Sequence, residues 1–174
     1  MRLTLRPITE GDTHLIVNWR NSPEVLSHCL TKSPITVDSH NKFFQEKIIS
    51  GKYKQFIVER IDETIGVVSY PIATVYLKDV DEENRRCELC IFTSNDSEWI
   101  LESQSVAIQM LIKKAFDEYG MHKVYSYVFV KNRDEIDLLK KSGFEIETIL
   151  KEEAMNDEGQ YEDIVRMYIL NERI

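Results

Sequence analysis

The sequence predicts a mixed α/β fold in which one sheet is flanked by helices. Two periodicities alternate along the chain. Short segments with an apolar side chain at every second position are typical of strands, and longer segments with apolar side chains three or four positions apart are typical of helices. Their order is one strand, two or three helices, three strands, a helix, a strand, a helix and two strands. Because no repeat, linker or low-complexity segment interrupts the 174 residues, we expect residues 1–174 to form one domain with a buried core.

The N-terminal part of the chain predicts one strand followed by helices. The strand alternates polar and apolar side chains and is closed by Pro7. N-cap candidates at residues 9–12 begin the first helix, and Asn21-Ser22-Pro23 ends it. Gly51 ends the last helix of this part. The expected elements are a strand over residues 2–6, a helix from residues 9–12 to Arg20, a short helix over residues 24–30 and a longer helix from residues 36–40 to Ser50.

The rest of the chain predicts strands with two helices between them. Asp62-Glu63 marks the turn of a hairpin, and Gly120 is suited to ending a long helix. Residues 156–159 carry the turn signal between the last two strands. The expected elements are strands over residues 56–59 and 64–70, the second continuing irregularly to Leu77, a charged loop over residues 79–84, a strand over residues 86–93, a helix over residues 103–119, a strand over residues 124–130, a helix within residues 132–142, and strands over residues 146–150 and 164–170.

Composition and charge exclude several classes of function. A net charge of −8 argues against a nucleic-acid-binding surface, because neutralising phosphates needs clustered Lys and Arg. No segment approaches the ~20 apolar residues that a membrane span requires. The chain opens on a strand pattern instead of the apolar core of a signal peptide. We therefore expect a cytoplasmic protein that binds neither nucleic acid nor membrane.

No metal site is expected. Cys87 and Cys90 lie on one predicted strand, where positions three apart face opposite sides, so the two thiols cannot share a metal ion. Together with Cys29 they form no disulfide framework. No metal-ligand spacing links the four histidines, which are His14, His28, His40 and His122.

The most informative segment covers residues 132–144, where a polar residue follows a predicted strand and a short amphipathic helix ends at Gly143-Phe144. Together with residues 115–124, it resembles the second half of GNAT-superfamily N-acetyltransferases. Nearly the whole chain is similar to the branch that includes ribosomal-protein N-terminal acetyltransferases and nucleotide-amino-sugar N-acetyltransferases. The other matching segments are residues 5–7, 19–25, 35–40, 65–67, 87–89 and 159–163, with Met167.

The resemblance implies a twisted mixed sheet of about seven strands whose fourth and fifth strands splay apart. It also implies acetyl-coenzyme A as co-substrate, with the pantetheine arm of that molecule paired to the free backbone of the fourth strand. An unpaired strand edge accepts an extended ligand that carries amide groups. The residues of this strand assigned to the arm are Leu89, Cys90, Ile91 and Phe92.

The pyrophosphate of the cofactor is expected at the start of the long central helix, where unpaired backbone N–H groups and the helix dipole attract anions. The family has glycines at this turn, whereas residues 99–104 contain none and Glu102 adds a negative charge. The alternative is an ordinary capped helix start that binds no anion. The residues assigned to this site are Leu101, Glu102, Ser103, Gln104 and Ser105.

The helix within residues 132–142 supplies two further cofactor candidates. Asn132 matches an Asn that hydrogen-bonds the pantetheine arm in family members, and capping of the helix is its other role. Glu135 stands where the ribosomal-protein branch often has a Ser near the cofactor thiol. It is either an acid toward the leaving thiolate or a solvated carboxylate, and we favour the latter. Leu139 occupies the position where many relatives have a Tyr that acts as general acid.

Glu88 is the candidate catalytic base. Alternation places it on the face of its strand opposite to Cys87 and Leu89, and it matches a Glu that serves as base in some family members. Apolar neighbours would raise the pKa of this carboxyl, which suits a group that takes a proton from an ammonium. The competing interpretation is an ion pair with Arg85 or Arg86.

Acceptor-binding residues are expected in the N-terminal helices and on the fifth strand. Arg20, flanked by Trp19 and Asn21, has a planar guanidinium that suits phosphate or carboxylate. The alternative is a buried Trp beside an Arg that bonds backbone carbonyls. His40 matches a His of the nucleotide-amino-sugar acetyltransferases, with a surface or capping role as the alternative. Tyr127 is either a substitute for the missing acid or a core aromatic residue.

We therefore predict an enzyme that transfers the acetyl group of acetyl-coenzyme A directly to a primary amine, without an acyl-enzyme. The acceptor would be a nucleotide-linked amino sugar, a protein N-terminus or a small amine, and residues 19–21 with residues 36–40 favour the sugar. We expect a monomer or a homodimer. The second hypothesis is a binding or regulatory protein that keeps this fold but has lost acetyl-coenzyme A.

Overall fold

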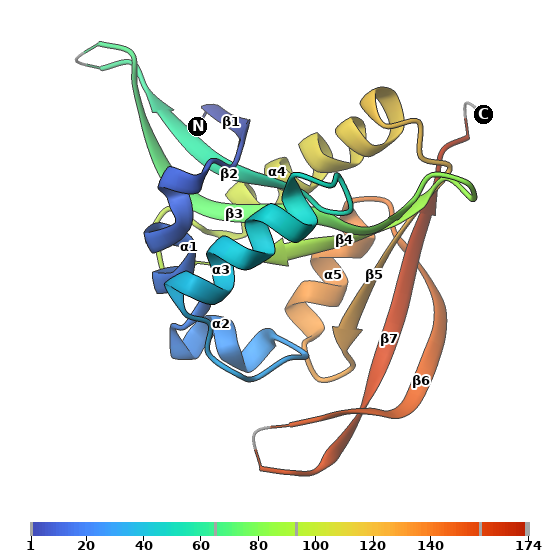
Figure 1. The fold of residues 1–174 in the computed structure, drawn as a ribbon. Helices are drawn as coiled ribbons and strands as arrows, with labels where there is room; N and C mark the ends of the chain where they lie inside the picture. The colour runs from blue at the N-terminus through green and yellow to red at the C-terminus, as the bar shows by residue number, and fades with distance from the viewer. Residues whose placement is uncertain (1, 65, 93, 157, 173–174) are drawn as a thin grey trace.

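The computed structural model describes residues 2–64, 66–92, 94–156 and 158–172, and its elements follow the predicted order (Figure 1). Seven strands form one mixed sheet with the order β1-β2-β3-β4-β5-β7-β6. Neighbouring strands are antiparallel except β4 and β5, which are parallel. The strands are β1 (Arg2–Pro7), β2 (Lys54–Asp62), β3 (Val68–Asp81), β4 (Arg86–Phe92), β5 (Lys123–Phe129), β6 (Glu145–Met155) and β7 (Tyr161–Leu170). The helices are the 3₁₀ turn η1 (Glu10–Asp12), α1 (Thr13–Arg20), α2 (Pro23–His28), α3 (Val37–Phe43), the π-helical turn η2 (Phe44–Ile48), α4 (Leu101–Lys113), the π-helical turn η3 (Lys114–Glu118) and α5 (Arg133–Lys141).

The helices α1, α2 and α3 form a layer on one side of the sheet (Figure 1). Local sequence sets their starts: Pro23 occupies the first turn of α2, and Thr36 caps α3 by accepting a hydrogen bond from the backbone N–H of Ser39 (3.1 Å). A small apolar cluster attaches this layer to β2. It consists of Ile8, Ile16, Trp19, Phe44 and Ile57.

The helices α4 and α5 pack on the other side of the sheet and enclose the main core. Ile108 and Leu111 of α4 and Leu139 of α5 are each at most 1% exposed, and they share this core with Leu77 of β3 and Leu89 of β4. Burial of these apolar side chains is the main force that holds the sheet between its two helical layers. Among the described residues, no helix is long and apolar enough to cross a membrane.

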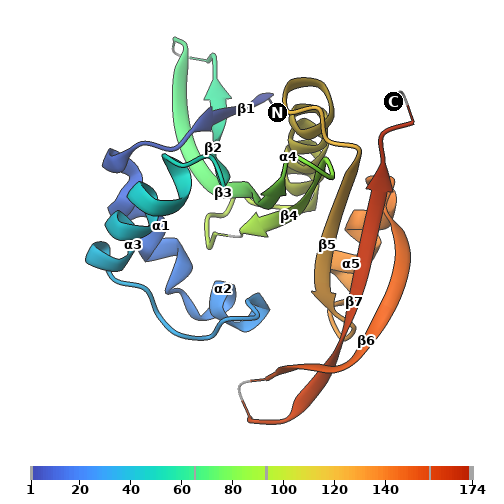
Figure 2. The ribbon, with the colours of Figure 1, turned by 45° about the vertical axis from the view of Figure 1, so that its right-hand side comes forward.

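The strands β4 and β5 diverge, as the resemblance implies. Their pairing starts at Arg86 with Lys123 and, within the described residues, ends at Glu88 with Tyr125. Beyond that point the two strands part, with α5 beside β5 and the N-terminal helices beside β4 (Figure 2). At the point of parting, the hydroxyl of Ser126 donates a hydrogen bond to the carbonyl of Leu89 (2.9 Å). The seven-stranded mixed sheet with a splayed fourth and fifth strand is therefore confirmed.

Several elements differ in length from the predicted segments. β3 begins at Val68 instead of Thr64 and runs to Asp81, so part of the expected charged loop belongs to the strand. The turn that follows is closed by Asp81, whose carboxylate accepts hydrogen bonds from the backbone and side chain of Asn84 (both 2.9 Å). β6 and β7 are longer because their backbone pairing continues past a bulge. α2 ends at residue 28 instead of 30, and α4 begins at residue 101 instead of 103. Of the residues expected in strands or turns, Ile65, Thr93 and Asp157 lie outside the described residues.

Candidate active site

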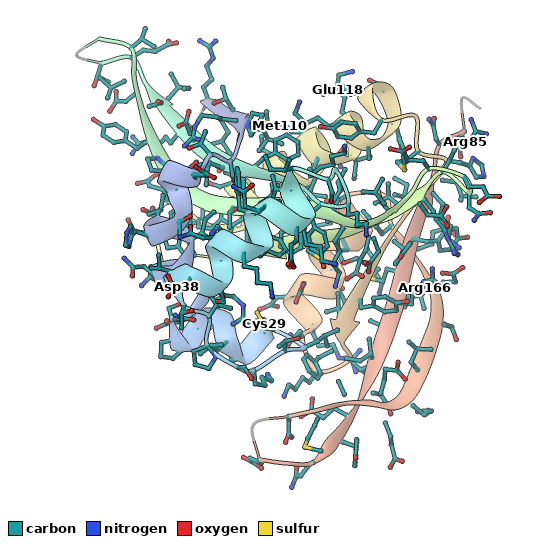
Figure 3. The ribbon with its side chains drawn as sticks, in the orientation of Figure 1. Cys29, Asp38, Arg85, Met110, Glu118 and Arg166 are labelled. Carbon is teal, nitrogen blue, oxygen red and sulfur yellow. The ribbon has the colours of Figure 1, made fainter. Side chains whose placement is uncertain are left out.

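A cavity of about 410 Å³ lies between the N-terminal helices and the sheet. The helices α1, α2, α3 and α5 and the strands β2 to β5 contribute to its wall. Figure 3 shows the side chains of this region, among them Cys29 after α2, which lines the cavity. Seven residues assigned to cofactor, catalysis or acceptor from the sequence are brought together here: Arg20, His40, Glu88, Cys90, Ile91, Tyr127 and Glu135.

Glu88 is buried in this wall at 5% exposure, and within the described residues it is the last residue of β4 that pairs with β5. Oε1 of Glu88 lies 3.2 Å from Nζ of Lys78 on β3 and accepts a hydrogen bond from the thiol of Cys90 (3.3 Å). Burial raises the pKa of Glu88, and the nearby ammonium of Lys78 opposes that rise. The competing interpretation from the sequence was an ion pair of Glu88 with Arg85 or Arg86. Its partner is Lys78 instead, and Arg86 pairs with Asp81 (3.1 Å).

His40 is buried at 4% exposure, whereas a surface or capping position was the alternative from the sequence. Its Nδ1 lies 3.1 Å from the hydroxyl of Thr13, which in turn donates to Oδ1 of Asn41 (3.1 Å). With the Asn41 amide assigned in this way, Thr13 has no second proton to give, so Nδ1 of His40 is the donor and Nε2 keeps its lone pair. Burial lowers the pKa of His40, which keeps the ring neutral. Within the described residues, the buried Nε2 has no hydrogen-bond partner.

Aromatic rings line the same cavity. Tyr53 stacks on Tyr76 with a centroid distance of 6.0 Å and meets Phe43 edge to face at 5.0 Å. Tyr127 of β5 contributes to the wall and contacts Tyr125 at 5.7 Å. Faces of such rings attract cations, so this part of the wall suits an ammonium group.

Of the three acceptor residues proposed in the first helix, only Arg20 reaches the cavity. It is 7% exposed, and one guanidinium nitrogen donates to the carbonyl of Thr31 (2.6 Å). Trp19 packs in the apolar cluster under α1. The side-chain amide of Asn21 makes two hydrogen bonds to the backbone of Ile35. Its NH2 group donates to the carbonyl of Ile35 (2.7 Å), and its oxygen accepts from the N–H of Ile35 (2.8 Å). The side chains of Trp19 and Asn21 therefore support the helices around the cavity and do not line it.

The start of α5 meets the end of α2. Nδ2 of Asn132 lies 3.2 Å from Nδ1 of His28, and the Asn132 side chain makes no capping hydrogen bond to α5. Oε2 of Glu135 lies 3.9 Å from the same nitrogen, and this carboxylate raises the pKa of His28 against the effect of burial. Glu135 is thus paired and half-buried in the cavity wall, in contrast to the fully solvated carboxylate favoured from the sequence.

The β4 edge fits the pantetheine arm. Residues 89–92 pair with β3 on one side, and within the described residues their pairing with β5 has ended. The side chain of Leu89 points into the core, so its contact with a ligand is limited to its backbone. An exposed backbone edge next to a cavity is the arrangement that an extended amide-bearing chain requires.

The start of α4 offers backbone groups to the pyrophosphate. Its N-cap position is Ile100, which makes no side-chain capping bond. The hydroxyl of Ser103 donates back to the carbonyl of Glu98 (2.6 Å), and the amide of Gln104 donates to the carbonyl of Trp99 (3.2 Å). Since two of the assigned side chains face backward, an anion here would be held mainly by the N–H groups of the first turn. The side chains of Leu101 and Glu102 are exposed, and that of Ser105 is half-buried.

Replacing Glu102 by Gln is expected to tighten the binding of coenzyme A by about two- to fivefold, because it removes a negative charge from the first turn of α4. Isothermal titration calorimetry at low salt measures this change. Glu46→Gln on η2, which removes an exposed carboxylate elsewhere, is the matched control and leaves Kd unchanged. An unaltered Kd in Glu102→Gln would place the phosphates away from Glu102.

The sequence did not indicate several residues of the cavity wall. Lys78 was missed because the strand pattern was followed only to Leu77. One more step of alternation would have placed it on the face of β3 opposite to Leu77, but its position beside Glu88 depends on the register between β3 and β4. Tyr53 carried no signal, since it lies in the short connection between η2 and β2. Tyr76 lay in the irregular continuation of its strand, and its approach to Tyr53 depends on the pairing of distant segments.

Comparison with known proteins places the chain in a family. Residues 2–145 match the sequence profile of the acetyltransferase (GNAT) domain. Spermidine N(1)-acetyltransferase of Vibrio cholerae is 26% identical over 172 residues, covering 99% of this chain and 95% of the relative. Acetyltransferase PseH of Campylobacter jejuni is 24% identical over 139 residues, covering 80% of each chain. The crystal structure of the Vibrio cholerae spermidine N-acetyltransferase with CoA and spermine has a TM-score of 0.83 at 26% identity, covering 97% of this chain and 95% of that one. The chain therefore belongs to the GNAT family of acetyl-coenzyme A-dependent N-acetyltransferases.

Proposed function

We propose that Glu88 is the general base for acetyl transfer to a primary amine bound in the cavity. The observation that carries this proposal is a buried carboxylate, with its pKa raised by burial, at the point where β4 and β5 part. Acetyl-coenzyme A supplies the acetyl group as a thioester. Glu88 takes a proton from the ammonium of the acceptor, whose nitrogen then forms the C–N bond while the C–S bond breaks. After the attack the nitrogen still carries one surplus proton, which passes to the departing sulfur, so the products are the amide, the free thiol and protonated Glu88. Glu135 and His28 lie in the same wall.

The charges of the cavity favour an acceptor with one ammonium. Its wall contains two carboxylates, Glu88 and Glu135, but also two cations, Arg20 and Lys78. A chain with three or four ammonium groups would meet repulsion that these carboxylates do not offset. A nucleotide-linked amino sugar has one amine, many hydroxyl groups and an anionic part that suits a guanidinium. We propose this class as the acceptor, ahead of a protein N-terminus or another small amine.

His40 supports an acceptor that carries hydrogen-bond donors. A buried lone pair without a partner costs about 1–3 kcal/mol, so a site that contains one gains from a ligand that donates to it. A sugar hydroxyl is such a donor. The protonation state of His40, fixed by Thr13 and Asn41, therefore favours polyhydroxylated acceptors.

A polyamine is the second candidate, because the Vibrio cholerae relative is named for spermidine and its structure contains spermine. An acceptor panel separates the two. With acetyl-coenzyme A and release of free thiol as the readout, kcat/KM for a nucleotide-linked amino sugar is expected to exceed that for spermidine by at least about tenfold. A peptide with a free N-terminus is the third acceptor of the panel. A larger kcat/KM for spermidine would replace the sugar by a polyamine.

The remaining expectations concern the whole protein. The chain has three free cysteines in its described part, Cys29, Cys87 and Cys90, which supports a reducing, cytoplasmic location. We propose that residues 1–174 act as one catalytic domain, as a monomer or a homodimer. A protein that keeps the fold but has lost acetyl-coenzyme A is disfavoured, because the open β4 edge and the cavity beside it are both preserved.

A further inference from the structure

The candidate base and Lys78 form a cross-strand pair. In the antiparallel register of β3 and β4, Lys78 lies directly opposite Glu88, so their side chains leave the same face of the sheet side by side. Nζ of Lys78 lies 3.2 Å from Oε1 of Glu88, and the two side chains are 24% and 6% exposed. Most ion pairs between described residues are more exposed than this one and contribute little to stability, whereas a pair with this burial restricts both partners.

The backbone immediately after Lys78 is irregular. The register between β3 and β4 shifts between Lys78 and Asp81, and Asp79 has a φ of 48°, in the left-handed region. A bulge of this kind redirects neighbouring side chains, and strained residues are retained near functional sites more often than elsewhere. Lys78 is the last residue of β3 that pairs in the regular register with β4 before this shift. Its backbone position is therefore set by the sheet, which limits the positions that its ammonium group can occupy.

Cys90 acts on the same oxygen of the base. Its thiol donates to Oε1 of Glu88 (3.3 Å) from two positions further along β4. Burial raises the pKa of Cys90 well above its ordinary value, so the group remains a thiol with a proton to donate. Both contacts are made by Oε1, and Glu88 lines the cavity, so Oε2 is the oxygen of this carboxylate that these two contacts leave for a ligand.

We propose that Lys78 and Cys90 are positioning residues for the acetyl transfer: together they hold Oε1 of Glu88 and leave Oε2 as the oxygen that takes the proton of the acceptor amine. This inference rests on the proposed role of Glu88 as base. A carboxylate held at one oxygen loses its rotational freedom and presents the other oxygen in a fixed direction, which is the requirement for efficient proton transfer.

The charge of Lys78 also sets the pH range in which the base works. Burial disfavours the carboxylate form of Glu88, and Lys78 favours it. On Lys78 itself, burial acts to lower the pKa, but the pairing with the Glu88 carboxylate opposes this and the pKa is raised overall, so the ammonium persists throughout the working range. Removal of this cation therefore raises the pKa of Glu88 further. The other titratable or charged groups around the cavity are Tyr53, Tyr76 and Asp79 beside the pair, Tyr125 and Tyr127 on β5, and Arg20, His28, Cys29, His40 and Glu135 from the helical side.

The test compares the acid limb of the kcat/KM profile in the wild type and three variants. Lys78→Met is expected to move this limb upward by about one to three pH units and to lower kcat/KM at pH 7 by about tenfold. Lys151→Met is the matched control, because it also removes a lysine from an ion pair. Lys151 lies 2.7 Å from Asp163, its side chain is 78% exposed, and it does not line the cavity. Lys78→Arg keeps the cation and leaves the limb within about half a unit of the wild type. Titration of the Glu88 carboxyl by ¹³C NMR in the cofactor-free protein is expected to show the same shift for Lys78→Met.

The outcomes separate this inference from the role of Glu88. If Glu88→Gln loses activity while Lys78→Met leaves the acid limb in place, the positioning role is overturned and the base remains. If Lys78→Met does not fold, Lys78→Arg decides, because a limb displaced by one unit or more in that variant contradicts the proposal. For the thiol, Cys90→Ala is expected to lower kcat/KM severalfold at an unchanged KM for the cofactor, and Cys90→Ser restores it, since a hydroxyl also donates to Oε1. Equal activity of the Ala and Ser variants would remove Cys90 from the proposal.

Discussion

Glu88→Gln is expected to lower kcat/KM for acetyl transfer by at least about 100-fold. The amide has the shape of the carboxyl but cannot take the proton of the acceptor ammonium. In the wild type, activity falls as the pH drops through the pKa of Glu88, which burial places above that of an ordinary carboxyl. In the variant this acid limb disappears. Thiol release measured from pH 5 to 9 records both effects.

Two controls accompany that measurement. Glu118→Gln removes an exposed carboxylate that pairs with Lys114 on η3, and it is expected to keep wild-type activity. Because Glu88→Gln leaves Lys78 without its counter-charge, its thermal stability is measured and the assay is run well below its Tm. A correctly folded variant that retains a tenth or more of wild-type kcat/KM would show that Glu88 is not the general base.

Leu139→Ala is expected to lower the free energy of unfolding by about 2–5 kcal/mol, the cost of a cavity in a closely packed core. Leu139 is 0% exposed and packs in the main core. By the family resemblance it occupies the helix position of a Tyr that acts as general acid. Urea unfolding measures the change, and Tm falls by roughly 5–15 °C. Leu101→Ala, at a leucine that is 59% exposed, is the control and stays within about 0.5 kcal/mol of the wild type.

A loss below 1 kcal/mol in Leu139→Ala would mean that α5 repacks with little resistance. The same burial bears on catalysis. Leu139 has no titratable group and packs in the main core, so we expect this position to contribute to stability and not to proton transfer.

Periodicity alone predicted the order of the elements. Each helix and strand buries one face, so its apolar residues recur with the period of a helix or of a strand. It predicted the orientation of Glu88 for the same reason: Cys87 and Leu89 are fully buried in the core, and Glu88 faces the cavity. The lengths of β3 and β6 were missed because backbone pairing extends beyond the apolar pattern and depends on the partner strand.

The divergence of β4 and β5 followed only from the family resemblance, since no local pattern indicates where two distant strands stop pairing. The contacts of the site show the same limit. Lys78 with Glu88, Asn132 with His28, and Thr13 with His40 join segments far apart in the sequence. For Trp19 and Asn21, the resemblance indicated the right region of the chain, but the structure gives these two side chains internal partners.

The hydrogen bond from Ser126 to the carbonyl of Leu89 has a consequence for the rate at which the co-substrate is captured. The Ser126 hydroxyl satisfies the carbonyl of Leu89, the first residue of β4 beyond its pairing with β5, within the polypeptide itself. In the described part of the chain, the backbones of the two strands do not pair beyond Glu88. We therefore expect the incoming arm to meet strands that are already separated, and capture of the co-substrate to need no preceding conformational step.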